Sequence, residues 1–181
     1  MWGRPASGSS GRSGARRSGA ASLAEVEREV AATVGRAAAG ALSSGAAELT
    51  TTTVVERHGG DASYDAPVVV LTPRNPRAAA VVVEVQDPEL WMLSAGDGPP
   101  YEFYTGMSGD WHELLHDLAE AAVAGRYRIE RREEWLRLLL RPWRRRRLEG
   151  TAAVFETARG VEATTHFGGA SFGAPREFEP Y

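Results

Sequence analysis

The segment PVVVLTPRNPRAAAVVVEVQD, residues 67–87, decides the fold class that the sequence predicts. Two valine-rich runs are separated by an Asn75-Pro76 turn, and each run is short enough to form one strand. Pro67 and Pro73 are expected to bound the first of these strands. The second run alternates in polarity, and Glu84 and Gln86 are expected to face outward. The positions expected to face the core are Ala79, Val81, Val83 and Val85. A connection this short favours antiparallel pairing of the two strands.

Further strands are expected on both sides of this segment. β-Branched residues dominate 49–58, hairpins are expected over 89–105 and 151–167, and residues 126–131 are expected to be extended. Residues 133–142, EEWLRLLLRP, fit a helix through Trp135, Leu138 and Leu139, and fit equally a strand through Leu136, Leu138 and Leu140. The aromatic residues expected in the core are Trp91, Tyr101, Phe103, Tyr104 and Trp111.

Two segments have the spacing of amphipathic helices. Residues 22–40 begin with a capping box formed by Ser22 and Glu25, and apolar residues then recur on one face. Residues 109–125, GDWHELLHDLAEAAVAG, form the second helix, which Gly125 ends. The order helix, strands, helix, strands predicts an α+β fold in which an antiparallel sheet carries helices packed on one face.

The chain is expected to contain a single α+β domain over residues 22–167. Residues 1–21 are rich in serine, glycine and arginine, and they bury too little apolar surface to offset the cost of ordering. They are therefore expected to form a disordered basic N-terminal tail. Residues 168–181 are expected to form a C-terminal loop or tail.

The composition excludes several classes of protein. The chain has no cysteine, so any metal site must use histidine or carboxylate ligands, and a reducing cytoplasm fits. All 21 basic residues are arginine, which indicates the codon usage of a GC-rich bacterial genome. No apolar run approaches the length of a membrane span, and acidic residues after Arg16-Arg17 argue against an export signal. A cytoplasmic protein with no membrane partner is expected.

The second helix contains a literal H-E-x-x-H motif, His112-Glu113-Leu114-Leu115-His116. Residues four apart on a helix lie about 6 Å from each other, so two imidazoles can share one zinc ion and the glutamate can deprotonate the bound water. In this respect the stretch resembles the zincin metallopeptidases. The resemblance implies His112 and His116 as ligands and Glu113 as the general base. A third ligand would be Glu134 or Glu133, as on the later helix of the gluzincin branch.

Two features argue against a working zinc site. Asp110 is typical of a helix N-cap and forms a D-x-x-E capping box with Glu113, so the helix begins at the motif itself and holds its first histidine poorly. On a helical wheel, both histidines lie on the polar arc, opposite Trp111, Leu115 and Leu118. The sequence therefore favours an exposed helix surface with no metal.

The segment 126–147 carries a concentrated positive charge. It contains ten arginines against three glutamates, whereas the whole chain has a net charge of −3. Two tryptophans interleave with the arginines, as at surfaces that contact phosphate and stack on bases. Alternatively, the arginines pair with the acidic remainder of the chain, or they form a docking face for an acidic protein. The residues expected to bind a partner are Arg141, Trp143, Arg144, Arg145, Arg146 and Arg147.

The favoured hypothesis is a non-catalytic binding protein that uses this arginine-rich surface to hold an acidic macromolecule, a protein rather than a nucleic acid. In size and general sequence character, the chain looks like the small bacterial immunity or antitoxin-like proteins that cap a partner. No cofactor is expected. The alternatives are a small zinc-dependent metallopeptidase built on the HELLH motif and a nucleic-acid binder acting through residues 126–147.

Overall fold

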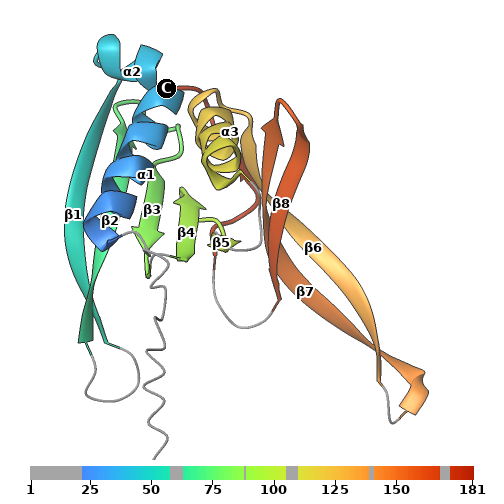
Figure 1. Cartoon of the computed structure of the whole chain (residues 1–181). Coiled ribbons are helices and arrows are strands. Elements are labelled where there is room, and N and C mark those ends of the chain that lie inside the picture. The colour runs from blue at the N-terminus through green and yellow to red at the C-terminus, as the bar shows by residue number, and fades with distance from the viewer. Residues whose placement is uncertain (1–21, 58–62, 88, 105–109, 139–140, 168–171) are drawn as a thin grey trace, which may run out of the picture.

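The computed structural model describes residues 22–57, 63–87, 89–104, 110–138, 141–167 and 172–181. Within these ranges, only the backbone is described for residues 55–57, 63–65, 135–138 and 141–146. The expected N-terminal tail, residues 1–21, lies outside the described residues. The α+β class and the antiparallel pairing are confirmed, and the strands divide between two sheets (Figure 1).

The first sheet has five antiparallel strands in the order β1-β2-β3-β4-β5. Its strands are β1 Ala47–Arg57, β2 Ser63–Pro73, β3 Val81–Val85, β4 Leu90–Ala95 and β5 Tyr101–Tyr104. The register aligns Val69 with Val83 and Val83 with Leu93, so one apolar row crosses three strands. As predicted, Ala79, Val81, Val83 and Val85 are fully buried. Alternation along β3 thus directs one face of this sheet into the core.

The second sheet has four antiparallel strands in the order β8-β7-β6-β9. Its strands are β6 Tyr127–Leu138, β7 Arg141–Thr157, β8 Gly160–Phe167 and β9 Arg176–Glu177. β7 and β8 form the hairpin that the sequence predicted at the end of the domain. β6 and β7 are much longer than their outer neighbours, β8 and β9. Part of the β6–β7 pair therefore extends beyond the other two strands of the second sheet.

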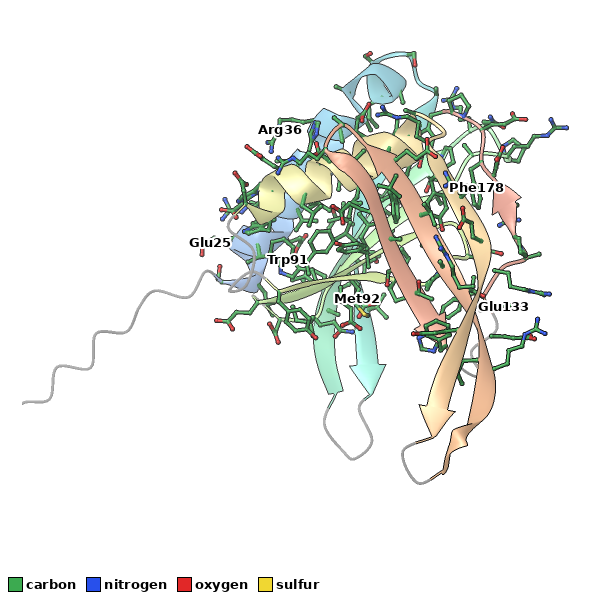
Figure 2. All side chains as sticks on the ribbon, turned by 90° about the vertical axis from the view of Figure 1, so that its right-hand side faces the viewer. Glu25, Arg36, Trp91, Met92, Glu133 and Phe178 are labelled. Atoms are coloured by element: carbon green, nitrogen blue, oxygen red, sulfur yellow. The ribbon has the colours of Figure 1, made fainter. Side chains whose placement is uncertain are left out.

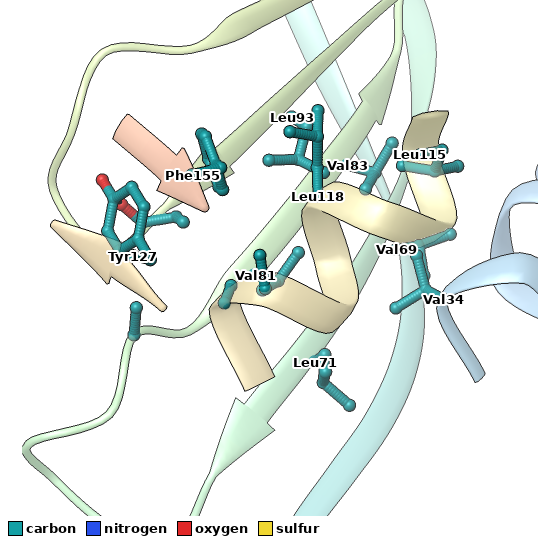
Figure 3. Close-up of a cluster of buried hydrophobic side chains, with 14 of the residues drawn as sticks. Val34, Val69, Leu71, Val81, Val83, Leu93, Leu115, Leu118, Tyr127 and Phe155 are labelled. Atoms are coloured by element: carbon teal, nitrogen blue, oxygen red, sulfur yellow. The ribbon is translucent and has the colours of Figure 1, made fainter. Parts of the chain in front are cut away.

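The helices pack between and against the sheets. They are α1 Leu23–Ala37, α2 Ala39–Ser43 and α3 Trp111–Val123. Val26, Val30 and Val34 of α1 and Leu115 and Leu118 of α3 enter one core cluster together with residues from both sheets (Figure 3). The expected capping box of Ser22 and Glu25 is present at the start of α1. None of the described helices is both long enough and apolar enough to cross a bilayer.

Tyr127 joins the two sheets. It begins β6, and its ring packs against Phe155 of β7 and Phe178, with ring centroids 4.7 and 5.0 Å away. Its hydroxyl donates a 2.7 Å hydrogen bond to the carbonyl oxygen of Ala95 at the end of β4. Because both groups are buried, loss of this bond would leave the Ala95 carbonyl unsatisfied, and an unsatisfied buried carbonyl costs about 1–3 kcal/mol.

The last residues of the chain pack on the body, which the prediction of a loop or tail at 168–181 did not anticipate. Phe178 is buried in the core, and the Tyr181 hydroxyl donates to the Ala79 carbonyl. Asn75 Nδ2 donates to the Pro180 carbonyl at 3.0 Å, and Arg77 pairs with Glu179 at 3.0 Å. These contacts hold the C-terminal segment against the turn between β2 and β3.

Three expectations need correction. The helical interpretation of residues 133–142 is wrong, because β6 continues as a strand to Leu138 and β7 begins at Arg141. Tyr104 is not a core residue, since 47% of it is exposed, whereas Trp91 and Phe103 are buried as expected. Pro67 does not bound its strand. β2 extends back to Ser63, and proline is tolerated because the ladder with β3 begins only at Val68.

Gly98 tests the contact between the sheets. A Cβ added there would collide with the Tyr127 hydroxyl, although the backbone of Gly98 is not left-handed. We expect Gly98→Ala to lower the free energy of unfolding by about 1–3 kcal/mol, as overpacking does. The matched control is Gly40→Ala in α2, where an added Cβ meets nothing within 4 Å. That control should be neutral or stabilising by up to about 1 kcal/mol. Urea unfolding measures the free energy of unfolding of both variants. Equal losses in Gly98→Ala and Gly40→Ala would contradict the close contact between Gly98 and Tyr127.

Alkaline pH provides a second test. Burial raises the pKa of Tyr127 and of Tyr181 above the ordinary tyrosine value. The unfolded chain releases these protons near pH 10, while the folded protein retains them. The stability that these two tyrosines contribute should therefore be constant below about pH 10 and fall as the pH rises further, and the fall should be shallower in Tyr127→Phe. Urea unfolding at a series of pH values measures the stability, and tyrosinate absorbance measures the ionisation of the tyrosines. Ionisation of Tyr127 near pH 10 in the folded protein would contradict the prediction.

Candidate functional site

The helix that carries the HELLH motif begins at the motif, as the sequence predicted. Asp110 is the N-cap, and its carboxylate accepts a 3.3 Å hydrogen bond from the backbone N–H of Glu113. His112 therefore lies in the first turn of α3. The carboxylate of Glu113 does not complete a capping box; it forms an ion pair with Arg159, in the turn between β7 and β8. Glu113 thus pairs with Arg159, whereas its spacing from Asp110 indicated a bond to the first backbone amides of its own helix.

Both histidines of the motif lie on the outer side of α3. Their side chains are 42% and 38% exposed, whereas Leu115 and Leu118 are fully buried beneath them. His112 Nε2 is 3.8 Å from Glu29 Oε2 on α1, and His116 Nδ1 is 3.6 Å from Asp117 Oδ1. The predicted orientation, with the apolar side toward the core and the imidazoles outward, is confirmed.

A shallow hollow of about 380 Å³ covers this part of α3. Arg159 lines this hollow and is paired with Glu113 and with Asp117, whose Oδ2 is 2.8 Å from Arg159 Nε. A guanidinium thus pairs with two of the carboxylates that lie beside the histidines. The sequence analysis missed Arg159, which lies 46 residues from Glu113, because no spacing pattern links a turn arginine to a distant helix.

The assignment of Glu134 or Glu133 as a third zinc ligand required a helix that is absent. Both residues lie on strand β6, where Glu133 pairs with Arg147 and Glu134 is aligned with Leu148. Among the described residues, no group of three histidine or carboxylate side chains is arranged to hold a metal ion. The structure therefore brings His112, Glu113 and His116 together, and it does not bring Glu133 or Glu134 to them.

The arginine-rich segment forms a projecting two-stranded ribbon. β8 pairs with β7 only from Gly150 to Thr157, and β9 pairs with β6 only at Arg128 and Ile129. Beyond these points β6 and β7 pair only with each other over the described residues 133–138 and 141–149, which we call the arm (Figure 1). The arginine-rich segment thus forms a long antiparallel strand pair.

The arginines at the base of this hairpin have acidic partners. Arg126 pairs with Glu120, and Arg128 pairs with Glu130 and Glu156. Further out, Arg132 Nη2 lies 3.0 Å from Glu130 Oε2. Arg147 pairs with Glu133, which lies where the ribbon leaves the body (Figure 2), and is 3.4 Å from Glu149. Pairing with acidic residues, one of the interpretations of the sequence, therefore holds for these four arginines.

Toward its tip, the arm has no acidic residue. Residues 135–148 contain six arginines and two tryptophans, and neither aspartate nor glutamate. The register aligns Trp135 with Arg147, Leu136 with Arg146, and Arg137 with Arg145. The side chains of Arg141, Trp143, Arg144, Arg145 and Arg146 lie outside the described residues, and the backbone places these residues on β7. Arginines thus concentrate on the part of the ribbon farthest from the acidic body.

Comparisons with protein-family models, with curated proteins and with solved structures found no match.

The zinc content of the purified protein tests the HELLH motif. Because Arg159 holds Glu113 and Asp117, we expect the native protein and His116→Ala to carry the same, substoichiometric amount of zinc after metal-free dialysis. Elemental analysis by mass spectrometry measures this. Glu113→Gln should cost only about 0–1 kcal/mol of stability, as loss of an exposed ion pair does. One zinc per chain that disappears in His116→Ala would restore the metallopeptidase hypothesis.

Proposed function

We propose that this chain is a non-catalytic binding protein whose arm engages an acidic surface of a partner protein, in the manner of an immunity or antitoxin-like protein that caps its target. The arm would supply the contact, and the two-sheet body would support it. The histidines of α3 would belong to an ordinary exposed helix surface.

The observation that carries the proposal is the placement of the arginines on an unsupported ribbon. A two-stranded hairpin alone is at best marginally stable in water. The register of the arm adds to this cost, because Arg137 and Arg145 are aligned on one face and like charges directly opposite each other destabilise a strand pair. An acidic partner that received the arm would neutralise these charges. Arginine and tryptophan, abundant here, are also the residues that most often dominate binding energy at protein interfaces.

A protein partner fits the arm better than a nucleic acid. Glu133, Glu134 and Glu149 lie at the base of the arm, where a polyphosphate chain would be repelled. Leu136 and Leu138 lie on either side of Arg137 in the sequence of β6, and apolar side chains gain more from a protein pocket than from a phosphate backbone. The whole chain is also acidic, with a net charge of −3, which disfavours long contact with a polyanion.

A photo-crosslinking experiment tests this function. The full chain with a photoreactive amino acid in place of Leu136 is irradiated in lysate of the source organism, with and without nuclease, and crosslinked species are identified by mass spectrometry. We expect a protein that is crosslinked through an acidic segment and is unaffected by nuclease. Crosslinks confined to nucleic acid would transfer the proposal to the nucleic-acid alternative, and the absence of any specific crosslink would contradict both.

Charge reversal supplies the quantitative check. Arg144→Glu with Arg146→Glu should weaken binding of the purified partner by roughly tenfold or more, because attractive pairs become repulsive. The control, Arg28→Glu with Arg74→Glu, makes the same change in net charge on the body. Isothermal titration calorimetry measures both. Equal losses would show that only overall charge matters, which the proposal does not allow.

A further inference from the structure

Strand β1 forms a long open edge of the first sheet. In the part of the chain that the structure describes, β1 pairs only with β2, and it lies on the side of the molecule opposite the arm (Figure 1). Its residues 49–55, LTTTTVV, include neither a charged residue nor a proline. Residues 50–54 are all exposed. Because successive side chains of a strand point to opposite faces of the sheet, neither face of β1 is covered there.

The other edge strands have features that discourage pairing with another chain. β5 has only four residues and follows Pro99 and Pro100. β9 has two residues, Arg176 and Glu177, and both are charged. β8 carries Glu162. Short length, proline and charge are the usual protections of a sheet edge, and residues 49–55 of β1 have none of them.

The backbone of β1 directs alternate residues toward this open edge. In an antiparallel pair, residues that exchange hydrogen bonds alternate with residues that do not. The N–H of Arg74 donates to the Ala46 carbonyl oxygen at 2.8 Å, which assigns the even-numbered residues to the ladder with β2. Thr53 is aligned with Pro67, which has no N–H to donate, and this agrees with the assignment. The odd-numbered residues of 49–55 therefore direct their N–H and C=O groups away from β2.

The far half of the β1–β2 pair also lacks a third strand. β2 pairs with β3 only from Val68 to Leu71, so within the described strands residues 53–57 and 63–67 pair only with each other. A two-stranded pair without further support is at best marginally stable in water. A strand added at the edge of β1 would extend this part of the sheet to three strands and would satisfy the outward backbone groups.

We propose that β1 pairs antiparallel with β1 of a second copy of this chain about a two-fold axis, so that the two five-stranded sheets continue into each other. A two-fold axis requires a surface that is complementary to itself. Residues 49–55 meet this requirement, because threonine and valine would lie opposite threonine and valine, and such pairs stabilise a sheet. The same residues offer no charge by which a strand of another protein could be selected. The arm takes no part, so this inference does not rest on its proposed function.

The charges at the ends of β1 restrict the position of the axis. An axis at Thr52 would place Glu48 opposite Glu56 of the second copy, and like charges directly opposite each other destabilise a strand pair. An axis at Thr51 or at Thr53 avoids this pair and still aligns most of the strand. The residue on the axis then lies opposite itself, with the two Cα atoms about 5.5 Å apart, because it belongs to the outward set that forms hydrogen-bonded pairs.

Single cysteines test the pairing directly, because the chain contains no cysteine of its own. The full-length variants Thr51→Cys, Thr52→Cys, Thr53→Cys and Val161→Cys are oxidised, and the linked dimer is measured on non-reducing gels. We expect Thr51→Cys or Thr53→Cys to link roughly tenfold faster than Thr52→Cys, because only the residue on the axis comes within disulfide range of itself. Val161, 65% exposed on the edge strand β8, is the control. Equal rates for all four variants overturn the proposal.

Sedimentation equilibrium measures the same pairing without a crosslink. We expect the unaltered chain to show a monomer–dimer equilibrium that Thr53→Pro weakens by roughly tenfold or more, because proline removes an outward N–H from each copy and leaves the ladder with β2 intact. Thr53→Val, which keeps that N–H, should dimerise as the unaltered chain does. The arm variant Arg144→Glu with Arg146→Glu should also dimerise normally, which separates this inference from the function of the arm. A monomer at every concentration, or association that does not stop at a dimer, overturns the proposal.

Discussion

The contact between Tyr127 and Ala95 holds the two sheets in their relative position. Tyr127 belongs to the second sheet, and its hydroxyl donates to a main-chain carbonyl at the end of β4 in the first. The bond lies in a core to which α1, α3, both sheets and Phe178 contribute. Because a buried carbonyl requires a donor, the second sheet has little freedom to shift without losing that bond. The direction of the arm relative to the first sheet follows from this position.

The HELLH motif has the local spacing of a zinc-binding helix, but the described residues around it form no group of three metal ligands. Its two histidines share a face of α3, as the helical period requires. A catalytic zinc site also needs a third ligand and a general base that is available for water. Here Arg159 pairs with the glutamate of the motif, and the two candidate third ligands lie on a distant strand. The motif is best explained as the polar side of an amphipathic helix.

The charges of the molecule are arranged by distance from the body. Arginines near the body, such as Arg126 and Arg128, are paired with glutamates. Those toward the tip of the arm have no acidic residue within their stretch of sequence. At the edges of β5 and β8, two carboxylates accept hydrogen bonds from tyrosine hydroxyls, Glu102 from Tyr104 and Glu162 from Tyr101.

The sequence by itself determined the α+β class, the alternation that buries β3, the capping box of α1 and the outward direction of His112 and His116. Each of these depends on residues close together in the chain, where helix and strand periods act directly. Only the tertiary structure decided that the strands form two sheets, that residues 133–138 are extended, and that Phe178 enters the core. It also paired Glu113 with Arg159 and brought Tyr101 to Glu162. These outcomes depend on contacts between distant segments, and local periodicity contains no information about them.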